Sequence, residues 1–189
     1  MHYCLIRKQK MIQSLKQKIN VLCIAVSTVL LVCACSAVPA DQVKHYRLPH
    51  LNQSSNGYCD AQSRRVRIDA GIGQDGVMVQ KSDLLMVEAK NNRWLGGLDS
   101  QLQNSLQRRL TEQCGQTLQL SLMQFYGNNQ GEAVVAGYWH YRAESNDVLS
   151  GHFEQRIPLS SDGYDGLVRA LDRAWLASLD EIEQAINNQ

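Results

Sequence analysis

The chain has 189 residues, of which 44% are apolar, 20% charged and 6% aromatic, and only three are prolines. This composition excludes disordered, collagen-like and disulfide-dense small proteins, and it fits one ordinary domain. Residues 1–34 carry five basic side chains and no acid, which leaves 14 Lys and Arg against 18 Asp and Glu in the rest. A mildly acidic domain without a basic block lacks the clustered cations that nucleic-acid binding needs.

The first segment, 1–34, has the order of a secretory signal peptide. A basic stretch precedes fourteen apolar or small residues, 21–34, which as a helix would span ~21 Å and fall short of the ~30 Å hydrocarbon core. This apolar length is typical of a signal peptide, and a short membrane anchor or buried helix is the alternative. The basic region is long, so Met1 and Met11 are both candidate starts.

The leader ends in Val32-Cys33-Ala34-Cys35, which resembles the bacterial lipobox. The small residue Ala34 precedes Cys35, whose thiol would form a thioether with a diacylglyceryl donor. Cys33 is a weaker candidate because bulky Val32 precedes it, and ordinary cleavage after Ala34 is the alternative. Because more than one acyl chain gives stable anchoring, we expect a lipid-anchored protein with a tether, 35–42, and a folded domain, 43–189. The residue after Cys35 is Ser36 and not Asp, which in lipoprotein sorting resembles an outer-membrane rather than an inner-membrane destination.

Two of the six cysteines, Cys59 and Cys114, lie in the expected domain. Since the periplasm is oxidising, an even pair predicts a disulfide, and two buried free thiols are the alternative. Closing a loop of about 55 residues would stabilise the domain by ~4 kcal/mol. No Cys or His spacing fits a zinc site, so we expect no metal and no other cofactor.

Alternating polarity predicts strands at 43–49, 64–70, 76–80, 83–89, 117–125, 133–142 and 149–157. A helix is expected over 98–110, where leucines recur every fourth residue and Gly115 lies at the C-terminal cap position. A second helix, about 164–186, has Asp162 as a candidate N-cap and one apolar stripe. This order predicts an α+β fold, a largely antiparallel twisted sheet with two helices packed on one face.

No motif in the sequence predicts catalysis. The glycines of 71–76 match GxGxxG, but a strand follows them rather than the helix that binds a pyrophosphate, so we interpret them as a turn. If the turn after 142 centres on Asn146, His140 and His152 lie opposite each other with Glu154 diagonal. Zinc needs three or four ligands, so we prefer a metal-free histidine pair. A periplasmic metal-dependent hydrolase using His140 and His152 is the alternative.

If the helices cover one sheet face, the opposite face presents a half-polar surface. We interpret it as a partner or self-association surface, because interfaces favour Tyr and Arg over Lys. Its members are Tyr138, His140, Arg142, His152, Glu154 and Arg156.

Seven collinear segments carry a family resemblance. They are the lipobox, Tyr46-Arg47-Leu48-Pro49, 76–83, Asn92-Arg93-Trp94, 98–106, Gly137-Tyr138-Trp139 and 162–168. Their order is similar to that of the ABC-type transport auxiliary lipoproteins. The glycine turn 71–76 departs from a proline-bearing stretch often found there, and Cys59 and Cys114 are not part of the pattern.

The resemblance implies an outer-membrane lipoprotein without enzymatic activity and without catalytic residues. It implies that the lipoprotein functions together with an MCE-domain protein, which bridges the periplasm and carries lipids between the membranes. It also implies that the lipoprotein contributes to envelope integrity. Members of this family are expected to form homo-oligomeric docking collars. A structural envelope lipoprotein that handles no lipid is a further alternative.

Overall fold

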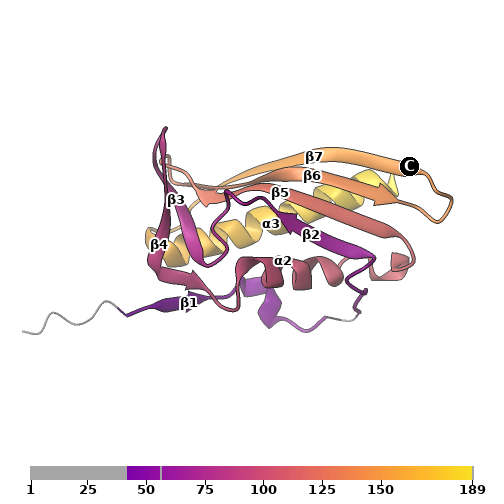
Figure 1. Cartoon of the computed structure of the whole chain (residues 1–189), viewed down its shortest axis with the longest axis horizontal. Coiled ribbons are helices and arrows are strands. Elements are labelled where there is room, and N and C mark those ends of the chain that lie inside the picture. Colours follow the sequence, from indigo (N-terminus) through magenta and orange to yellow (C-terminus); the bar gives the residue numbers. More distant parts are fainter. Residues whose placement is uncertain (1–41, 56, 189) are drawn as a thin grey trace, which may run out of the picture. The chain divides into compact units, whose positions relative to one another are not determined.

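The computed structural model describes residues 42–55 and 57–188, so the leader and Cys35 lie outside the described residues. The described chain forms seven strands and two α-helices in the order predicted from the sequence (Figure 1). The strands are β1 (Lys44–Tyr46), β2 (Arg64–Ile68), β3 (Gly76–Ser82), β4 (Leu85–Trp94), β5 (Thr117–Gly127), β6 (Glu132–Arg142) and β7 (Val148–Pro158). The helices are α2 (Leu98–Gln107), α3 (Gly163–Asn187) and two short 3₁₀ segments, η2 (Pro49–Asn52) and η3 (Thr111–Gln113).

The strands form one mixed sheet in the order β1-β4-β3-β5-β6-β7, with β2 also paired to β5. The long pairs β3–β4, β5–β6 and β6–β7 are antiparallel, whereas β1–β4, β2–β5 and a short β3–β5 contact are parallel. The α+β class is therefore confirmed. β1 and β2 come before the β3–β4 hairpin in the chain. β1 pairs with β4 and β2 pairs with β5, in both cases in the parallel direction.

Both helices lie against the same face of the sheet. The helix α3 runs along β5, β6 and β7, as Figure 1 shows, and its predicted apolar stripe is buried from Val168 to Ile186. The helix α2 packs on β2 and contacts α3 through a hydrogen bond between Trp175 and Ser105. Removing these side chains from water is the main stabilising contribution, at roughly 1.5–3 kcal/mol for each large apolar side chain.

Two details of the helix ends differ from the prediction. The helix α2 ends at Gln107, with Arg108 as the C-terminal cap and Leu110 in a left-handed conformation. Gly115 is therefore not the cap. The helical path ends because Leu110 is left-handed, and the carbonyls of Arg109 and Leu110 accept hydrogen bonds from the buried Arg64. Asp162 occupies the predicted N-cap position of α3, but its side chain makes no capping hydrogen bond.

The described residues 42–55 and 57–188 contain no helix with both the length and the apolar character of a membrane-spanning segment.

Candidate functional site

The six residues of the predicted partner surface lie on the exposed face of the sheet, on β6 and β7. Tyr138, His140 and Arg142 are exposed, whereas the alternating Trp139 and Tyr141 of β6 are buried under the helices. On β7, His152, Glu154 and Arg156 are also exposed. Successive side chains of a strand point to opposite faces, and both helices cover the face opposite to these six. The structure thus brings them together on one helix-free face.

The predicted opposition of His140 and His152 is wrong. His140 pairs with Ser150, and Tyr138 pairs with His152. The turn centres one residue earlier than assumed, because Arg142 pairs with Val148 and the amide of Ala143 donates to the carbonyl of Asp147. Asn146 lies within this turn with a positive φ of 67°, a conformation that Asn adopts more readily than most residues. The two histidines are therefore diagonal neighbours on one face.

The described part of the chain, 42–55 and 57–188, contains no group of three or more His, Cys, Asp or Glu side chains that could hold a metal ion. On the sheet face, Glu154 is instead engaged with Arg156 at 2.8 Å. The hydrogen bond from this guanidinium to Glu154 is the main cause that raises the pKa of Arg156. Both groups are about half exposed, so the pair contributes little to stability and remains available to a partner.

Two shallow depressions lie side by side on the exposed face. One, of about 310 Å³, lies over β5–β7 beside Tyr138 and His152. The other, of about 350 Å³, lies over β3–β5 and is lined in part by Met78, Met86 and Met123. Met123 borders both depressions. Methionine side chains adapt to irregular surfaces, so this face offers an adaptable apolar centre beside a polar area.

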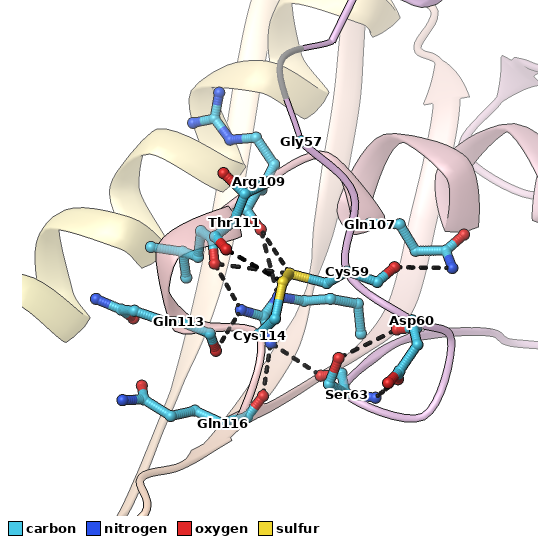
Figure 2. Close-up of a disulfide and its surroundings, with 12 residues drawn as sticks. Gly57, Cys59, Asp60, Ser63, Gln107, Arg109, Thr111, Gln113, Cys114 and Gln116 are labelled. Carbon is cyan, nitrogen blue, oxygen red and sulfur yellow. Dashed lines mark hydrogen bonds between the residues drawn. A yellow bond between two sulfur atoms is a disulfide. The ribbon is translucent and has the colours of Figure 1, made fainter.

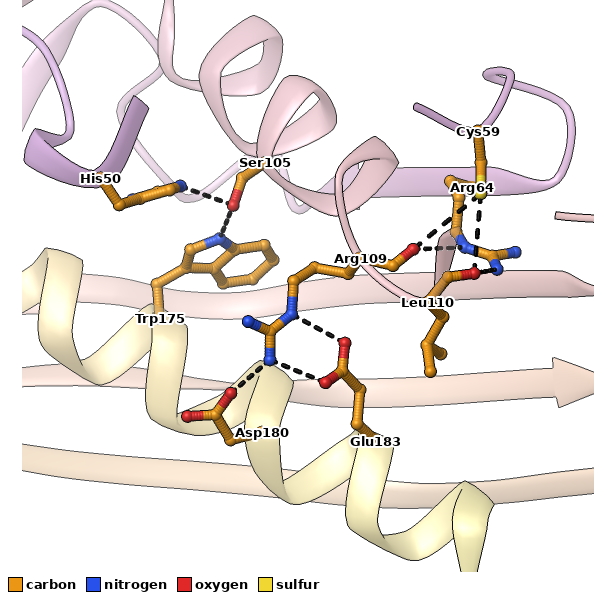
Figure 3. A network of polar contacts seen from close by, with 9 residues as sticks. All are labelled: His50, Cys59, Arg64, Ser105, Arg109, Leu110, Trp175, Asp180 and Glu183. Atoms are coloured by element: carbon orange, nitrogen blue, oxygen red, sulfur yellow. Dashed lines mark hydrogen bonds and ion pairs between the residues drawn. The ribbon is translucent and has the colours of Figure 1, made fainter. Parts of the chain in front are cut away.

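A polar cluster that we did not predict joins η2, α2 and α3. His50 Nδ1 lies 2.5 Å from Asp172 Oδ1, and His50 Nε2 lies 2.7 Å from Ser105 Oγ. The indole N–H of Trp175 donates to the same Ser105 oxygen at 2.8 Å (Figure 3). The order Asp, His, Ser has the connectivity of a serine-hydrolase triad. A nucleophilic serine must, however, be reachable by a substrate carbonyl.

The burial of Ser105 favours a structural role for this cluster. Ser105 is only 2% exposed, and its oxygen already has two partners, Trp175 and His50. Asp172 is also buried, and its carboxylate further accepts the backbone N–H of His50 at 3.4 Å. Buried polar groups require such partners, because an unsatisfied one costs about 1–3 kcal/mol. The cluster therefore positions η2 on the two helices.

The segment from β1 to η2 is attached to both helices by further hydrogen bonds. The hydroxyl of Tyr46 donates to Asp165 of α3 at 2.8 Å. The side chain of Gln101 of α2 accepts the backbone N–H of Leu48 at 2.8 Å and donates to the carbonyl of Tyr46 at 3.1 Å. We call residues 44–52 the leading segment. Gln101 and Ser105 recur within the apolar stripe of α2, and this recurrence is the sequence signal that could have revealed their burial.

A disulfide joins Cys59 and Cys114 at the far end of α2 (Figure 2). Cys59 is also held by a backbone hydrogen bond to the carbonyl of Gln107 at 2.7 Å, and the Gln107 amide donates back to the carbonyl of Cys59. The bridge thus connects the chain before β2 with the turn between α2 and β5.

Beside the disulfide, Arg64 is completely buried. Its guanidinium donates to the backbone carbonyls of Ser63, Arg109, Leu110, Gln113 and Gln116. Burial lowers the pKa of Arg64. Several of these carbonyls follow the end of α2, where backbone acceptors lack helical partners. Arg64 shares its strand face with Val66 and Ile68, and this alternation is the signal for its inward position.

An ion-pair group connects α2 to the C-terminal half of α3. Arg109 donates to both carboxylate oxygens of Glu183, at 2.7 and 2.9 Å, and also contacts Asp180 (Figure 3). The bidentate geometry is the favourable one for an Arg–carboxylate pair. Together with Arg64 and the disulfide, this group fixes the end of the domain remote from the leading segment.

Comparisons with known proteins agree with this architecture. A family described as "ABC-type transport auxiliary lipoprotein component" matches residues 116–183, which span β5 to most of α3. The chain is 26% identical over 160 residues to the intermembrane transport lipoprotein PqiC of Escherichia coli (strain K12) and of Shigella flexneri. Each alignment covers 75% of this chain and 85% of the relative.

Two solved structures share the fold. A crystal structure described as an uncharacterized protein has a TM-score of 0.63 and 25% identity, and the match covers 77% of this chain and 99% of that one. A Xanthomonas campestris protein of the DUF330 family has a TM-score of 0.56 and 13% identity, over 74% and 92% of the two chains.

The match over residues 116–183 supports the predicted similarity to the ABC-type transport auxiliary lipoproteins. Over about three quarters of its length, the chain is similar to the intermembrane transport lipoprotein PqiC.

Proposed function

We propose that the chain is a non-catalytic, outer-membrane lipoprotein component of an MCE-type intermembrane lipid-transport system and that it contributes to envelope integrity. The observation that carries the proposal is the similarity to the intermembrane transport lipoprotein PqiC along 85% of that protein. In this proposal, residues 1–34 are a removed leader and acylated Cys35 holds the domain 43–189 in the periplasm by the tether 35–42. The lipobox-like sequence before Cys35 supports the anchor.

The helix-free face of β6 and β7 is the proposed contact for the periplasm-spanning MCE partner and for further copies of the chain. Tyr138, which is 55% exposed, and the exposed Arg142 belong to residue types that are enriched in protein interfaces. The adjoining depression beside Tyr138 and the exposed Met123 add apolar area next to this polar group. A stable contact needs about 800 Å² from each partner.

Charge reversal at Arg142 tests this surface. Arg142→Glu places an acid at the exposed end of β6, whereas Arg169→Glu makes the same charge change on the exposed side of α3. We expect Arg142→Glu to reduce co-purification with the MCE-domain partner, and Arg169→Glu to leave it at the wild-type level. Thermal unfolding should be near wild type for both variants. Equal co-purification of the two variants would remove this face from the proposal.

The lipid content of the purified complex separates transport from a purely structural role. Phospholipid that co-purifies with the chain and its partner supports transport, whereas a complex free of lipid supports a structural envelope lipoprotein. The hydrolase alternative is not favoured by the geometry of its two residues, because His140 and His152 are not cross-strand partners and Glu154 is engaged with Arg156.

A further inference from the structure

The tip of the β3–β4 hairpin carries four consecutive exposed apolar side chains. Leu84 is 98% exposed, and Leu85, Met86 and Val87 are 53%, 41% and 36% exposed. Single exposed apolar residues are ordinary, but an uninterrupted run of this length opposes folding and solubility unless a function requires it. In Figure 1 the hairpin projects from one end of the domain, beyond the helices that cover the sheet.

The local backbone does not require a leucine at this place. Ser82 pairs with Leu85, so Asp83 and Leu84 form a two-residue connection, a position where Asn-Gly or Asp-Gly is favoured. Asp83 and Ser82 supply the polar contacts of the turn, from Asn129 Nδ2 to the Asp83 carboxylate and from the Leu84 amide to Ser82 Oγ. The Leu84 side chain is almost entirely in solvent, and it therefore contributes little to the folded domain.

Apolar groups occupy both faces of this narrow ribbon. Leu85 and Val87 alternate with Met86 along β4, so they point to opposite sides. A docking surface for a folded protein is one-sided, with an apolar centre and a polar rim. Residues 84–87 have apolar side chains on both sides of the strand and suit immersion in an apolar medium, whereas the polar residues 80–83 of the same hairpin suit the headgroup region. Lys81, exposed on the preceding strand, can extend its ammonium group toward an interface.

The position of the leading segment relates this tip to the proposed anchor. The strand β1 is parallel to β4, with Lys44 opposite Asn92 and Tyr46 opposite Trp94, so the first residue of β1 lies toward the hairpin end of β4. The nine residues from Cys35 to Lys44 span at most ~30 Å when extended. The seven residues from Asn92 back to Leu85 rise ~23 Å. The tether therefore permits the acylated cysteine and the hairpin tip to reach one membrane plane.

We propose that Leu84 and its apolar neighbours insert into the lipid surface to which the chain is anchored, as a second, non-covalent contact. The inference rests on the proposed anchoring through Cys35. A second contact fixes the orientation of the domain, which a single flexible tether cannot do. The partner face on β6 and β7 is then held at a defined angle to the membrane.

A depth measurement on the full, processed chain tests the proposal. The protein is reconstituted in vesicles of phosphatidylethanolamine and phosphatidylglycerol, with an NBD fluorophore on Leu84→Cys. The matched control carries the fluorophore on Ser145→Cys, in the exposed β6–β7 turn at the opposite end of the sheet. Since Cys59 and Cys114 are bonded to each other and Cys35 is acylated in the proposal, the introduced thiol is the single one that labels.

We expect a blue shift and quenching by nitroxide-labelled acyl chains at position 84, and neither at position 145. Equal, water-like emission at both positions would overturn the proposal. A shift at 84 that requires added MCE partner, or that grows with protein density on the vesicles, would also overturn it, because a protein would then cover the tip. Leu84 is almost fully exposed, so the substitution leaves the folded domain intact.

Flotation with the vesicles separates this inference from the anchor itself. A chain that does not float lacks the acyl anchor, and the proposed function then fails. In that case Cys35 would carry a free thiol, so the same vesicles are titrated into a labelled chain that also carries Cys35→Ser: quenching at position 84 would support the lipid contact alone, and its absence would overturn it.

Discussion

Removing the Cys59–Cys114 bridge is expected to lower the free energy of unfolding by about 4 kcal/mol. The two cysteines are separated by 55 positions, and the chain-entropy relation gives about 4 kcal/mol for a closed loop of that length. The native geometry survives without the bond, because two hydrogen bonds between Gln107 and Cys59 hold the same segment. The loss therefore arises mainly in the unfolded chain, which gains conformational freedom.

Thermal unfolding of a Cys59→Ala, Cys114→Ala double variant beside the wild type measures this loss. At ~2–4 °C per kcal/mol for a domain of this size, the melting temperature should fall by roughly 8–16 °C. Cys59 is 1% exposed, so the reductant has to act during prolonged incubation near the transition. Reductant should then lower the melting temperature of the wild type and leave the double variant unchanged. A double variant that melts with the wild type would refute the reasoning.

Two further perturbations follow from the buried polar groups. Arg64→Met should lower the free energy of unfolding, measured with urea, by about 3–5 kcal/mol, because the carbonyls that the guanidinium binds lose their donors. A loss below about 1 kcal/mol would contradict that role. Burial, followed by the hydrogen bond to Asp165, raises the pKa of Tyr46 from 10.0 to about 12. Because the folded-state pKa is the higher one, this stabilisation is complete below pH 10 and is lost as the pH rises to about 12. Tyr46→Phe should therefore flatten the decline of melting temperature over that range, and an unchanged decline would show that Tyr46 is not its source.

The regular elements were predictable because each has one buried and one exposed side. The stripe from Val168 to Ile186 repeats every three or four residues, and all of it is buried in α3. Leu118, Leu120 and Leu122 alternate with polar residues in β5 and are likewise buried. Since burial decides which face turns inward, the exposed side of β6 and β7 followed directly from the sequence.

The features that the sequence did not predict depend on contacts between distant segments. Beyond the end of α2, the carbonyls of Arg109 and Leu110 are bound by Arg64, which lies more than forty positions earlier. The register of β6 and β7 is set by the geometry of the turn that connects them. When the centre of this turn shifts by one residue, each residue of β6 lies opposite a residue of β7 two positions away from the predicted one. The cluster around His50 joins three elements; Asp172 and Trp175 share one face of α3, but no local spacing connects them with Ser105 or His50.

The attachment of the leading segment bears on how an anchored domain resists being pulled. β1 pairs with β4 through only three residues, so a force applied through the tether would open that short ladder first. Beyond it, Leu48 and Leu51 are buried, and His50 is bonded to Asp172 of α3 and Ser105 of α2. Removing the segment would therefore expose apolar surface and leave buried polar groups without partners, at a cost of several kcal/mol. If Cys35 holds the chain at the membrane, the contacts of the leading segment with both helices and the core resist a force applied at the anchor. The partner face can then bind another protein under load without unfolding of the domain from its attached end.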